Sequence, residues 1–180
     1  QIEDPKEAKG LVKRGVVKII TPGTIDSGLN DKENNFIGAI TQIKRDYLLV
    51  YADLTTGEIY LTKYNSFDVL ANEIISLHIK EIVVLSNYNN ENLLKLASKN
   101  QIVISNVTDV LIPNNLYYII EDLDASYQDA VKLIIKYYIE TKKIEPKHFK
   151  KVKSFIGEEY LKLDAFTKKN LEICETLRYN

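Results

Sequence analysis

Carboxylates near the ends of predicted strands are the first groups in this chain that could do chemistry. Asp53 follows an apolar run, at a position where a metal-dependent nuclease could place one of its carboxylates. Such a site needs several carboxylates that converge on hard cations such as Mg²⁺. No other acidic residue falls inside a predicted core strand, so the sequence Asp53-Leu54-Thr55-Thr56-Gly57 is interpreted as a turn in which the Asp53 side chain accepts backbone hydrogen bonds.

The remaining candidate reactive side chains are two histidines and one cysteine. His78 and His148 lie far apart and lack Cys, His or acidic neighbours at metal-ligand spacing, which predicts structural or surface roles. Cys174 has no obvious adjacent base, and burial against absent parts of the protein is the better interpretation than nucleophilic catalysis. We therefore predict no catalytic, cofactor-binding or metal-binding residue in this chain.

Composition narrows the function classes further. The glycines are scattered singly, so no Gly-rich phosphate loop with its Lys and Ser or Thr is present. The 24 Lys and Arg residues nearly cancel the 25 Asp and Glu residues, so the positive field that supplies most non-specific nucleic-acid affinity is missing. A hydrophobic fraction of 45% predicts a globular chain, and its apolar runs are too short to span a bilayer. The single Cys, the absence of a signal-peptide pattern and the absent initiator Met lead us to expect a cytoplasmic, excised piece.

The elements that must position these residues begin with a β-rich half. Residues 11–20 favour an extended segment, which Thr21-Pro22-Gly23-Thr24 ends with a firm bend. Three runs at 36–44, 47–53 and 58–63 are separated by turn-prone residues and predict an antiparallel meander.

An alternation of helices and strands follows. Ser66 is the predicted N-cap of a helix with apolar residues from Phe67 onward, and the run 82–85 predicts a buried strand. A short helix to Lys99, a strand at 102–104 and a long helix over 125–142 capped by Asp124 come next, and residues 146–153 suggest a linker. The fold class is therefore α/β, with a mixed sheet in the order βββαβαβα flanked by helices, which is the topology of ribonuclease-H-like folds.

Two motifs near the ends of the chain carry a family resemblance. The first runs Glu3-Asp4-Pro5-Lys6-Glu7-Ala8-Lys9-Gly10 and continues into Val16-Val17-Lys18-Ile19-Ile20-Thr21-Pro22-Gly23-Thr24. The second is Leu163-Asp164-Ala165-Phe166-Thr167-Lys168-Lys169-Asn170-Leu171-Glu172. Together they resemble the MutS family of DNA mismatch-repair ATPases. The family's Phe-x-Glu mismatch-reading motif is absent.

The resemblance implies a division of the chain and a role. Residues 1–22 would lead from an absent mismatch-binding domain, 23–145 would form the connector domain with a ribonuclease-H-like fold, and 146–180 would open a helical lever, with Asp164 as a helix cap. The chain would relay mismatch and nucleotide states between domains without catalysis of its own. ATP, magnesium and mismatched DNA would bind elsewhere in the full-length protein, which we expect to be a homodimer in the bacterial cytoplasm, associated with the nucleoid.

The resemblance also implies a partner, MutL, which would meet the region of the last helix. The candidate contacts are the polar residues on its exposed face: Gln128, Lys132, Lys136, Glu140 and Lys143. Joints on either side of a rigid body would allow it to move, and the candidate hinges are Thr21, Pro22, Gly23, Thr24 and Pro146. Tyr117, Tyr118, Tyr127, Tyr137 and Tyr138 cluster around the last helix, where Tyr137 is expected in the core and Tyr138 at its border. The pairs Lys13-Arg14 and Lys168-Lys169 are interpreted as surface charge, or as phosphate contacts in an intact clamp.

The sequence leaves two alternative functions open. The first is a divergent metal-dependent nuclease with a ribonuclease-H-like core, which would require carboxylates to converge around Asp53. The second is the connector of a MutS paralogue that works outside mismatch repair.

Overall fold

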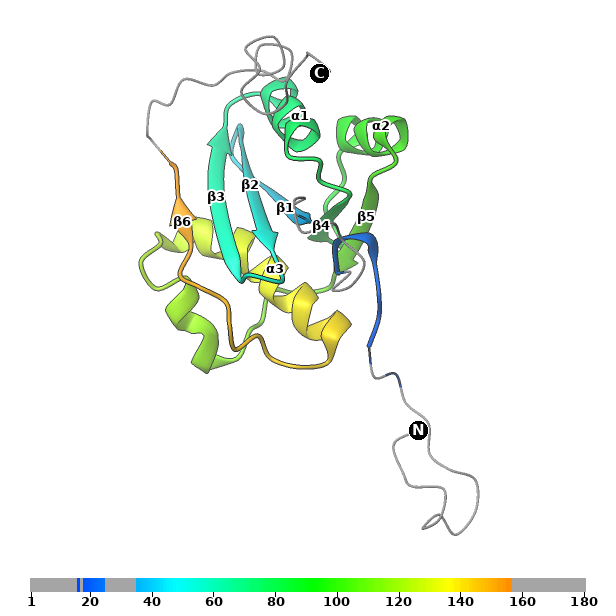
Figure 1. Ribbon diagram of the computed structural model, residues 1–180. Coiled ribbons are helices and arrows are strands. Elements are labelled where there is room, and N and C mark those ends of the chain that lie inside the picture. Colours follow the sequence, from blue (N-terminus) through cyan, green and yellow to red (C-terminus); the bar gives the residue numbers. More distant parts are fainter. Residues whose placement is uncertain (1–15, 17, 25–34, 157–180) are drawn as a thin grey trace, which may run out of the picture.

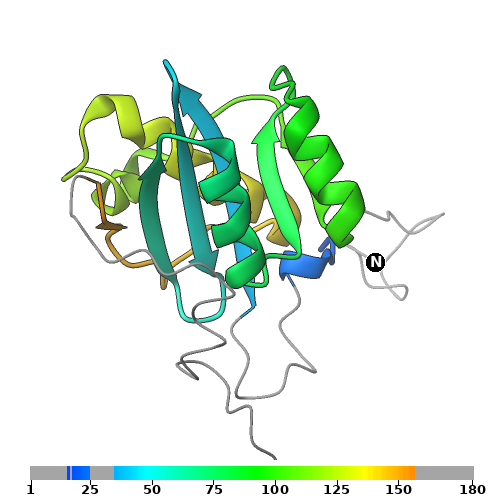
Figure 2. The ribbon, with the colours of Figure 1, turned by 90° about the horizontal axis from the view of Figure 1, so that it is seen from above.

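The computed structural model describes residues 16, 18–24 and 35–156 of the 180-residue chain. A six-stranded mixed sheet in the order β5-β4-β1-β2-β3-β6 forms the middle of three layers. Helices α1 and α2 lie on one face and α3 lies on the other (Figures 1 and 2). The predicted α/β class and the mixed sheet flanked by helices are thereby confirmed. Among the described residues, no helix is both long and apolar enough to cross a membrane.

The first three strands form the predicted antiparallel meander. Strand β1 (Phe36–Ile43) pairs with β2 (Asp46–Asp53), which pairs with β3 (Glu58–Tyr64). Along β2, Leu48, Val50 and Ala52 face one core while Leu49 faces the other, so both faces of this strand are buried. This burial explains why the strand reads as a nearly continuous apolar run in the sequence.

The chain then crosses over twice on one face of the sheet. Helix α1 (Phe67–Ser76) begins at Ser66, whose hydroxyl accepts from the N–H of Asp68. It leads to β4 (Glu81–Leu85), which runs parallel to β1. Helix α2 (Glu91–Asn100) leads in the same way to β5 (Val103–Val107), parallel to β4. The fifth strand thus lies one to three residues later than the predicted 102–104.

The other face is covered by α3 (Ala125–Lys142), which follows a 3₁₀ segment, η2 (Asn114–Ile119). Asp124 occupies the predicted N-cap position, although its side chain makes no capping hydrogen bond. Apolar residues of α3, such as Leu133 and Ile134, belong to the larger of the two cores, in which α3 packs onto β1 and β2. Tyr137 and Tyr138 are both buried, so Tyr138 lies deeper than the predicted core border.

The segment after α3 packs onto the domain, although the sequence suggested a linker there. Phe149 is buried, and β6 (Lys153–Ser154) adds to β3 as a parallel edge strand. Rings of Phe36, Tyr51, Tyr60 and Phe155 form a row across the strands, with adjacent centroids 5.0–6.3 Å apart. This aromatic row extends the sheet to its last strand, in a segment too short to show strand periodicity.

Several sequence features lie outside the described residues. They are most of the extended segment 11–20, both basic pairs, the part of the lever segment from residue 157 onward with its cap Asp164, and Cys174.

Candidate partner surface and polar core

The five candidate partner residues lie along α3, but part of this surface is already engaged within the protein. Lys132 is only 14% exposed, forms a 2.9 Å ion pair with Asp129, and holds its ammonium group 5.7 Å from the centre of the Tyr117 ring. Gln128 donates from its amide to the carbonyl of Leu123. These contacts fix both side chains against the segment that precedes the helix.

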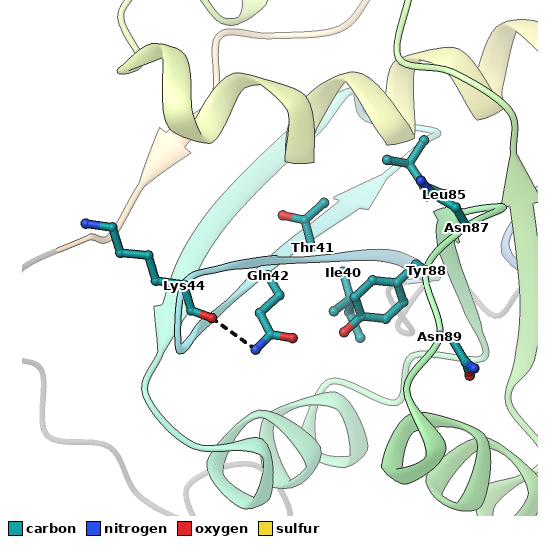
Figure 3. A pocket seen from close by; sticks show the side chains of 8 residues that line it. All are labelled: Ile40, Thr41, Gln42, Lys44, Leu85, Asn87, Tyr88 and Asn89. Atoms are coloured by element: carbon teal, nitrogen blue, oxygen red, sulfur yellow. Dashed lines mark hydrogen bonds between the residues drawn. The ribbon is translucent and has the colours of Figure 1, made fainter.

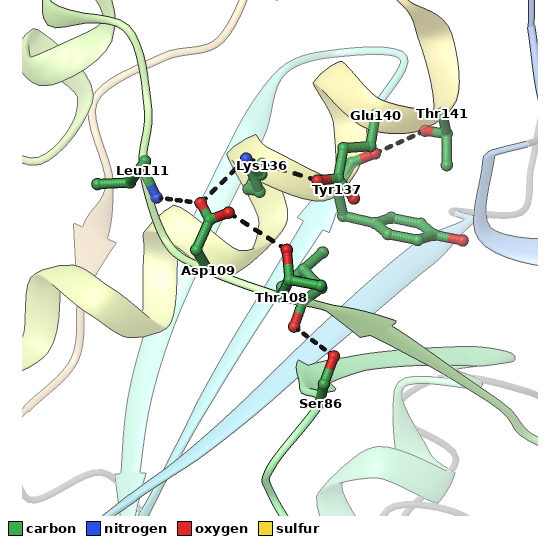
Figure 4. A network of polar contacts seen from close by, with 9 residues as sticks. Ser86, Thr108, Asp109, Leu111, Lys136, Tyr137, Glu140 and Thr141 are labelled. Atoms are coloured by element: carbon green, nitrogen blue, oxygen red, sulfur yellow. Dashed lines mark hydrogen bonds and ion pairs between the residues drawn. The ribbon is translucent and has the colours of Figure 1, made fainter.

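Lys136 is the centre of a polar network between α3 and the segment after β5 (Figure 4). Its ammonium lies 3.0 Å from Asp109 and 3.5 Å from Glu140, and its side chain is 19% exposed. The N–H of Leu111 and the Lys136 ammonium donate to Asp109, and these bonds hold the pKa of its carboxyl below the ordinary value. The bond to Asp109 in turn raises the pKa of Lys136. The network positions Leu111, whose side chain is 76% exposed.

Lys143, the last of the five candidate partner residues, lies at the C-terminus of α3. It adopts a left-handed conformation with φ of 58°, donates its N–H to the carbonyl of Ile139, and leaves its side chain exposed. The helix therefore presents Glu140 and Lys143 more openly than Lys132 or Lys136. Leu111 and Asp109, which the sequence reasoning did not single out, complete the surface, because the aperiodic segment after β5 offers no pattern that would place it over α3.

Three of the four N-terminal hinge candidates form a short 3₁₀ turn, η1 (Pro22–Thr24), against the end of the sheet, and the fourth, Thr21, directly precedes it. The N–H of Thr21 donates to the Thr24 hydroxyl at 2.8 Å, which closes the turn. The Lys142 ammonium donates to the carbonyl of Thr24 at 2.6 Å, and Gly23 and Thr24 are buried. Just before the turn, the N–H of Ile19 donates to the carbonyl of Thr141. These bonds attach η1 to the C-terminal end of α3. That the chain bends at these four residues stays a prediction.

A fully buried carboxylate, Glu81 in the sheet, accepts a hydrogen bond from the η1 turn. The N–H of Gly23 donates to its Oε2 at 2.7 Å, and the Ser105 hydroxyl donates to its Oε1 at 2.6 Å. Tyr137 of α3 donates its hydroxyl to the same Oε1. Burial, and then this bond to the carboxylate, raise the pKa of Tyr137. One side chain therefore joins η1, β4, β5 and α3.

Pro146, the C-terminal hinge candidate, is buried at the start of the packed segment. The His148 ring lies 2.8 Å through Nε2 from the carbonyl of Leu54, and the Tyr118 hydroxyl donates to the carbonyl of Phe149. The Phe149 ring meets the edge of Tyr138 at a centroid distance of 4.9 Å. His148 accordingly has the structural role predicted for it.

Asp53 occupies the predicted turn. Its Oδ1 accepts from the N–H and the hydroxyl of Thr55 at 2.8 and 2.6 Å, and from the N–H of Thr56 at 3.3 Å. The expectation that no other acidic residue lies in a core strand is wrong, because Glu81 is the first residue of β4. The sequence reading began that strand at Ile82, since Lys80-Glu81 resembles a polar turn.

Asp53 and Glu81 nevertheless cannot form a metal-binding pair. Asp53 pairs with Phe36 and Glu81 pairs with Ile37. Paired residues share a face of a sheet and consecutive residues alternate, so the two carboxylates belong to opposite faces. Within residues 16, 18–24 and 35–156, which the structure describes, no group of three or more His, Cys, Asp or Glu side chains could hold a metal ion.

Comparison with known proteins places the chain in one family. The family model described as MutS domain II matches residues 35–153, and the model described as MutS domain I matches residues 1–28. The chain is 37% identical to the DNA mismatch repair protein MutS of Geobacillus sp. (strain WCH70), over 99% of this chain and 21% of that protein. It is 36% identical to the DNA mismatch repair protein MutS of Bacillus pumilus (strain SAFR-032), with the same two coverages.

The chain thus spans 21% of the length of these curated relatives. The domain II match covers almost all of the sheet and its helices, from the residue before β1 to the first residue of β6. The chain belongs to the MutS family of DNA mismatch repair proteins.

Proposed function

We propose that this chain is the connector of a MutS protein, which transmits mismatch and nucleotide states between neighbouring domains and offers a docking surface to MutL. The observation that carries the proposal is the match of residues 35–153 to MutS domain II. Under this proposal the chain has no catalysis of its own, and ATP and magnesium act in another part of a homodimeric, cytoplasmic protein.

The packing of the domain supports a mechanical role. The entering turn is fastened to Glu81 and α3 by the Gly23 and Lys142 bonds, and the leaving segment is fastened by Phe149 and β6. A body held at both ends moves as a unit, because tightly packed interiors transmit displacement rather than absorb it. Rotation about hinges near Thr21–Thr24 or Pro146 would then carry the whole sheet, which we propose to have the ribonuclease-H-like arrangement, followed by a lever segment.

The proposed MutL surface consists of the five α3 candidates together with Asp109 and Leu111. An exposed apolar side chain beside a row of charged groups is suited to a transient interface, in which an apolar centre gives affinity and a polar rim gives orientation. The Lys136 network matters here because it holds the segment that carries Leu111.

The test is a binding titration of the folded 180-residue chain against the N-terminal domain of the cognate MutL. Leu111→Ser and Glu140→Lys should each weaken binding by about tenfold if they lie at the centre of the interface. Lys95→Glu on α2 is the control, because its exposed ion pair with Glu91 lies in the other helix layer. Equal affinity of all variants would place the MutL site elsewhere.

A charge-exchange pair separates recognition from integrity of the network. Lys136→Glu alone breaks the ion pair with Asp109, whereas Lys136→Asp combined with Asp109→Lys restores a pair of opposite charges. Recovery of binding in the double variant would indicate that binding requires the ion pair and not the Lys136 charge itself. Continued loss would indicate that the ion pair is not sufficient, because Asp109→Lys also removes the acceptor of the Leu111 N–H.

A further inference from the structure

A crevice opens inside the sheet between two parallel strands. Pairing of β1 with β4 runs from Ile37–Glu81 to Ala39–Val83 and ends there. Strand β1 continues to Ile43, paired on its other side with β2, and β4 continues to Leu85, paired with β5. In the described part of the chain, no strand fills the space between the diverging ends.

The diverging end of β1 offers main-chain hydrogen-bonding groups. In an antiparallel pair, alternate residues direct both N–H and C=O toward the partner strand, and the intervening residues direct them away. Two of the four residues 40–43 therefore direct these groups toward the β4 side, beyond the last β1–β4 pair. Such groups act as a template for an added strand.

The crevice is a cavity of about 500 Å³ (Figure 3). Its lining comes from the end of β1, the turn after it, and the loop between β4 and α2: Ile40, Thr41, Gln42, Lys44, Leu85, Asn87, Tyr88 and Asn89. Three of these side chains are primary amides, each with two donors and an acceptor, which match the groups of a peptide backbone. Tyr88 and Leu85 supply apolar surface between them.

The charge of the cavity lining is positive. Among the described residues that line the cavity, Lys44 is the only one with an ionised side chain and none is a carboxylate, and Arg45 follows Lys44 in the same turn. The Gln42 amide donates to the carbonyl of Lys44, which holds the turn at the rim. This arrangement favours a ligand that carries a negative charge near the end of β1.

The crevice also lies at a position where open α/β sheets commonly bind ligands. After β1 the chain continues to β2 on one side, and after β4 it continues to β5 on the other side. In open α/β sheets, such a reversal leaves a crevice outside the carboxyl ends of the strands, and binding sites concentrate there.

We propose that this crevice binds an extended peptide segment of a partner protein, which adds to the free side of β1 and places an acidic side chain at Lys44. The main chain of the peptide would bond to residues 40–43, and the amides of Gln42, Asn87 and Asn89 would bond to its remaining polar groups. The lining shares no residue with the proposed MutL surface, so this proposal does not depend on MutL docking.

The test uses nuclear magnetic resonance on the ¹⁵N-labelled 180-residue chain and one designed probe. The probe is the peptide acetyl-Thr-Val-Thr-Val-Thr-Asp-amide, with a matched peptide in which Lys replaces the Asp. Added to about 2 mM, a concentration suited to a short peptide that loses entropy on binding, the acidic probe should shift the amides of 41–43 and 85–89. Loss of these shifts in Asn87→Ala combined with Asn89→Ala is expected.

Charge reversal makes the proposal falsifiable in a folded protein. In Lys44→Glu the preference should change to the Lys peptide, with the acidic peptide binding about threefold more weakly, a typical effect for one exposed charge pair. Lys95→Glu should leave both affinities unchanged. Shifts confined to another surface, no shift with either peptide, or shifts at the same amides produced by AMP or phosphate but not by peptide would overturn the proposal.

Discussion

Gly23 donates its backbone N–H to Oε2 of Glu81 at 2.7 Å, so a residue of the entering segment is bonded to a buried carboxylate 58 positions later in the chain. A Cβ at position 23 would lie 2.9 Å from this oxygen and 3.0 Å from Ile37. The lack of a side chain at Gly23 is what permits the approach. A backbone donor therefore fixes where the chain enters the domain.

Gly23→Ala should destabilise the domain by about 1–3 kcal/mol, because the added methyl group must displace either Glu81 or Ile37. Urea unfolding followed by circular dichroism measures the loss. Gly38→Ala is the matched control, since its Cβ would meet only apolar side chains, Ile79 at 3.2 Å and Ile82 at 3.6 Å, among its three nearest atoms. A loss in Gly38→Ala as large as that in Gly23→Ala would contradict this explanation.

Replacement of Glu81 should have a graded effect. Glu81→Leu leaves the Gly23 N–H and the Ser105 hydroxyl without their acceptor and leaves the Tyr137 hydroxyl its 3.2 Å bond to Ser105, which should cost at least about 2 kcal/mol. Glu81→Gln retains one acceptor oxygen and should cost less. The free energies of unfolding of the two variants give the comparison, and an equal loss would show that size, not hydrogen bonding, matters at this position.

Gly57→Ala should detach the segment after α3. Gly57 has φ of 73°, and a Cβ there would lie 2.2 Å from the carbonyl oxygen of His148. Backbone strain and the clash together should cost about 2–4 kcal/mol. Hydrogen exchange should accelerate most at the Lys150 amide, which donates to the Gly57 carbonyl. Uniform acceleration across the sheet would mean that the segment does not open separately.

Asp53 variants distinguish the turn from a nuclease site. Asp53→Asn keeps an oxygen that can accept from Thr55 and should change stability by less than about 1 kcal/mol, whereas Asp53→Ala should cost about 1–2 kcal/mol. Neither the unmodified chain nor the variants should cleave DNA or RNA with magnesium or manganese. Cleavage that disappears in Asp53→Asn while stability is retained would revive the nuclease alternative.

The partly buried Tyr51 predicts a loss of stability at high pH. Burial, followed by the charges of Glu73 and Tyr60, raises the pKa of Tyr51 to about 12. A raised pKa means that the folded state holds the proton more tightly, so this contribution is complete below about pH 10 and declines as the pH rises toward 12. Tyr51→Phe should flatten the decline in unfolding free energy over this range. Tyr117→Phe, at a ring 42% exposed, is the control and should leave the decline unchanged.

The sequence predicted the elements whose burial is periodic or continuous. The meander, α1, α2 and α3 have bounds within a few residues of those expected, because strong apolar patterns and caps such as Ser66 mark them. Glu81 was missed because a buried charge contradicts the pattern by which core strands are recognised. Its partners come from three distant segments, so no local signal indicates that the carboxylate is satisfied.

The segment after α3 and the surface of α3 were harder to predict from the sequence, for a different reason. A two-residue strand such as β6 has no periodicity, and its position depends on Phe149 and on the aromatic row, which only the folded sheet brings together. The helical spacing of Lys132 and Lys136 placed them correctly on one side of α3. It could not show that Tyr117 and Asp109 would cover them, because Tyr117 lies in the short 3₁₀ helix η2 and Asp109 lies in the loop after β5, and neither segment has a pattern that places it over α3.

The ends of the domain meet on a single turn of α3. Thr141 and Lys142 bond the entering segment, and Tyr138, one turn earlier, packs against Phe149 of the leaving segment. A tensile load on the leaving segment would first reach β6 and its pairing with β3, and then Phe149. From Tyr138 the load would reach the bonds of the entering segment over about 6 Å of helix, at the 1.5 Å rise of each residue. In mechanical terms the last turn of α3 is a short tie between the two ends of the domain.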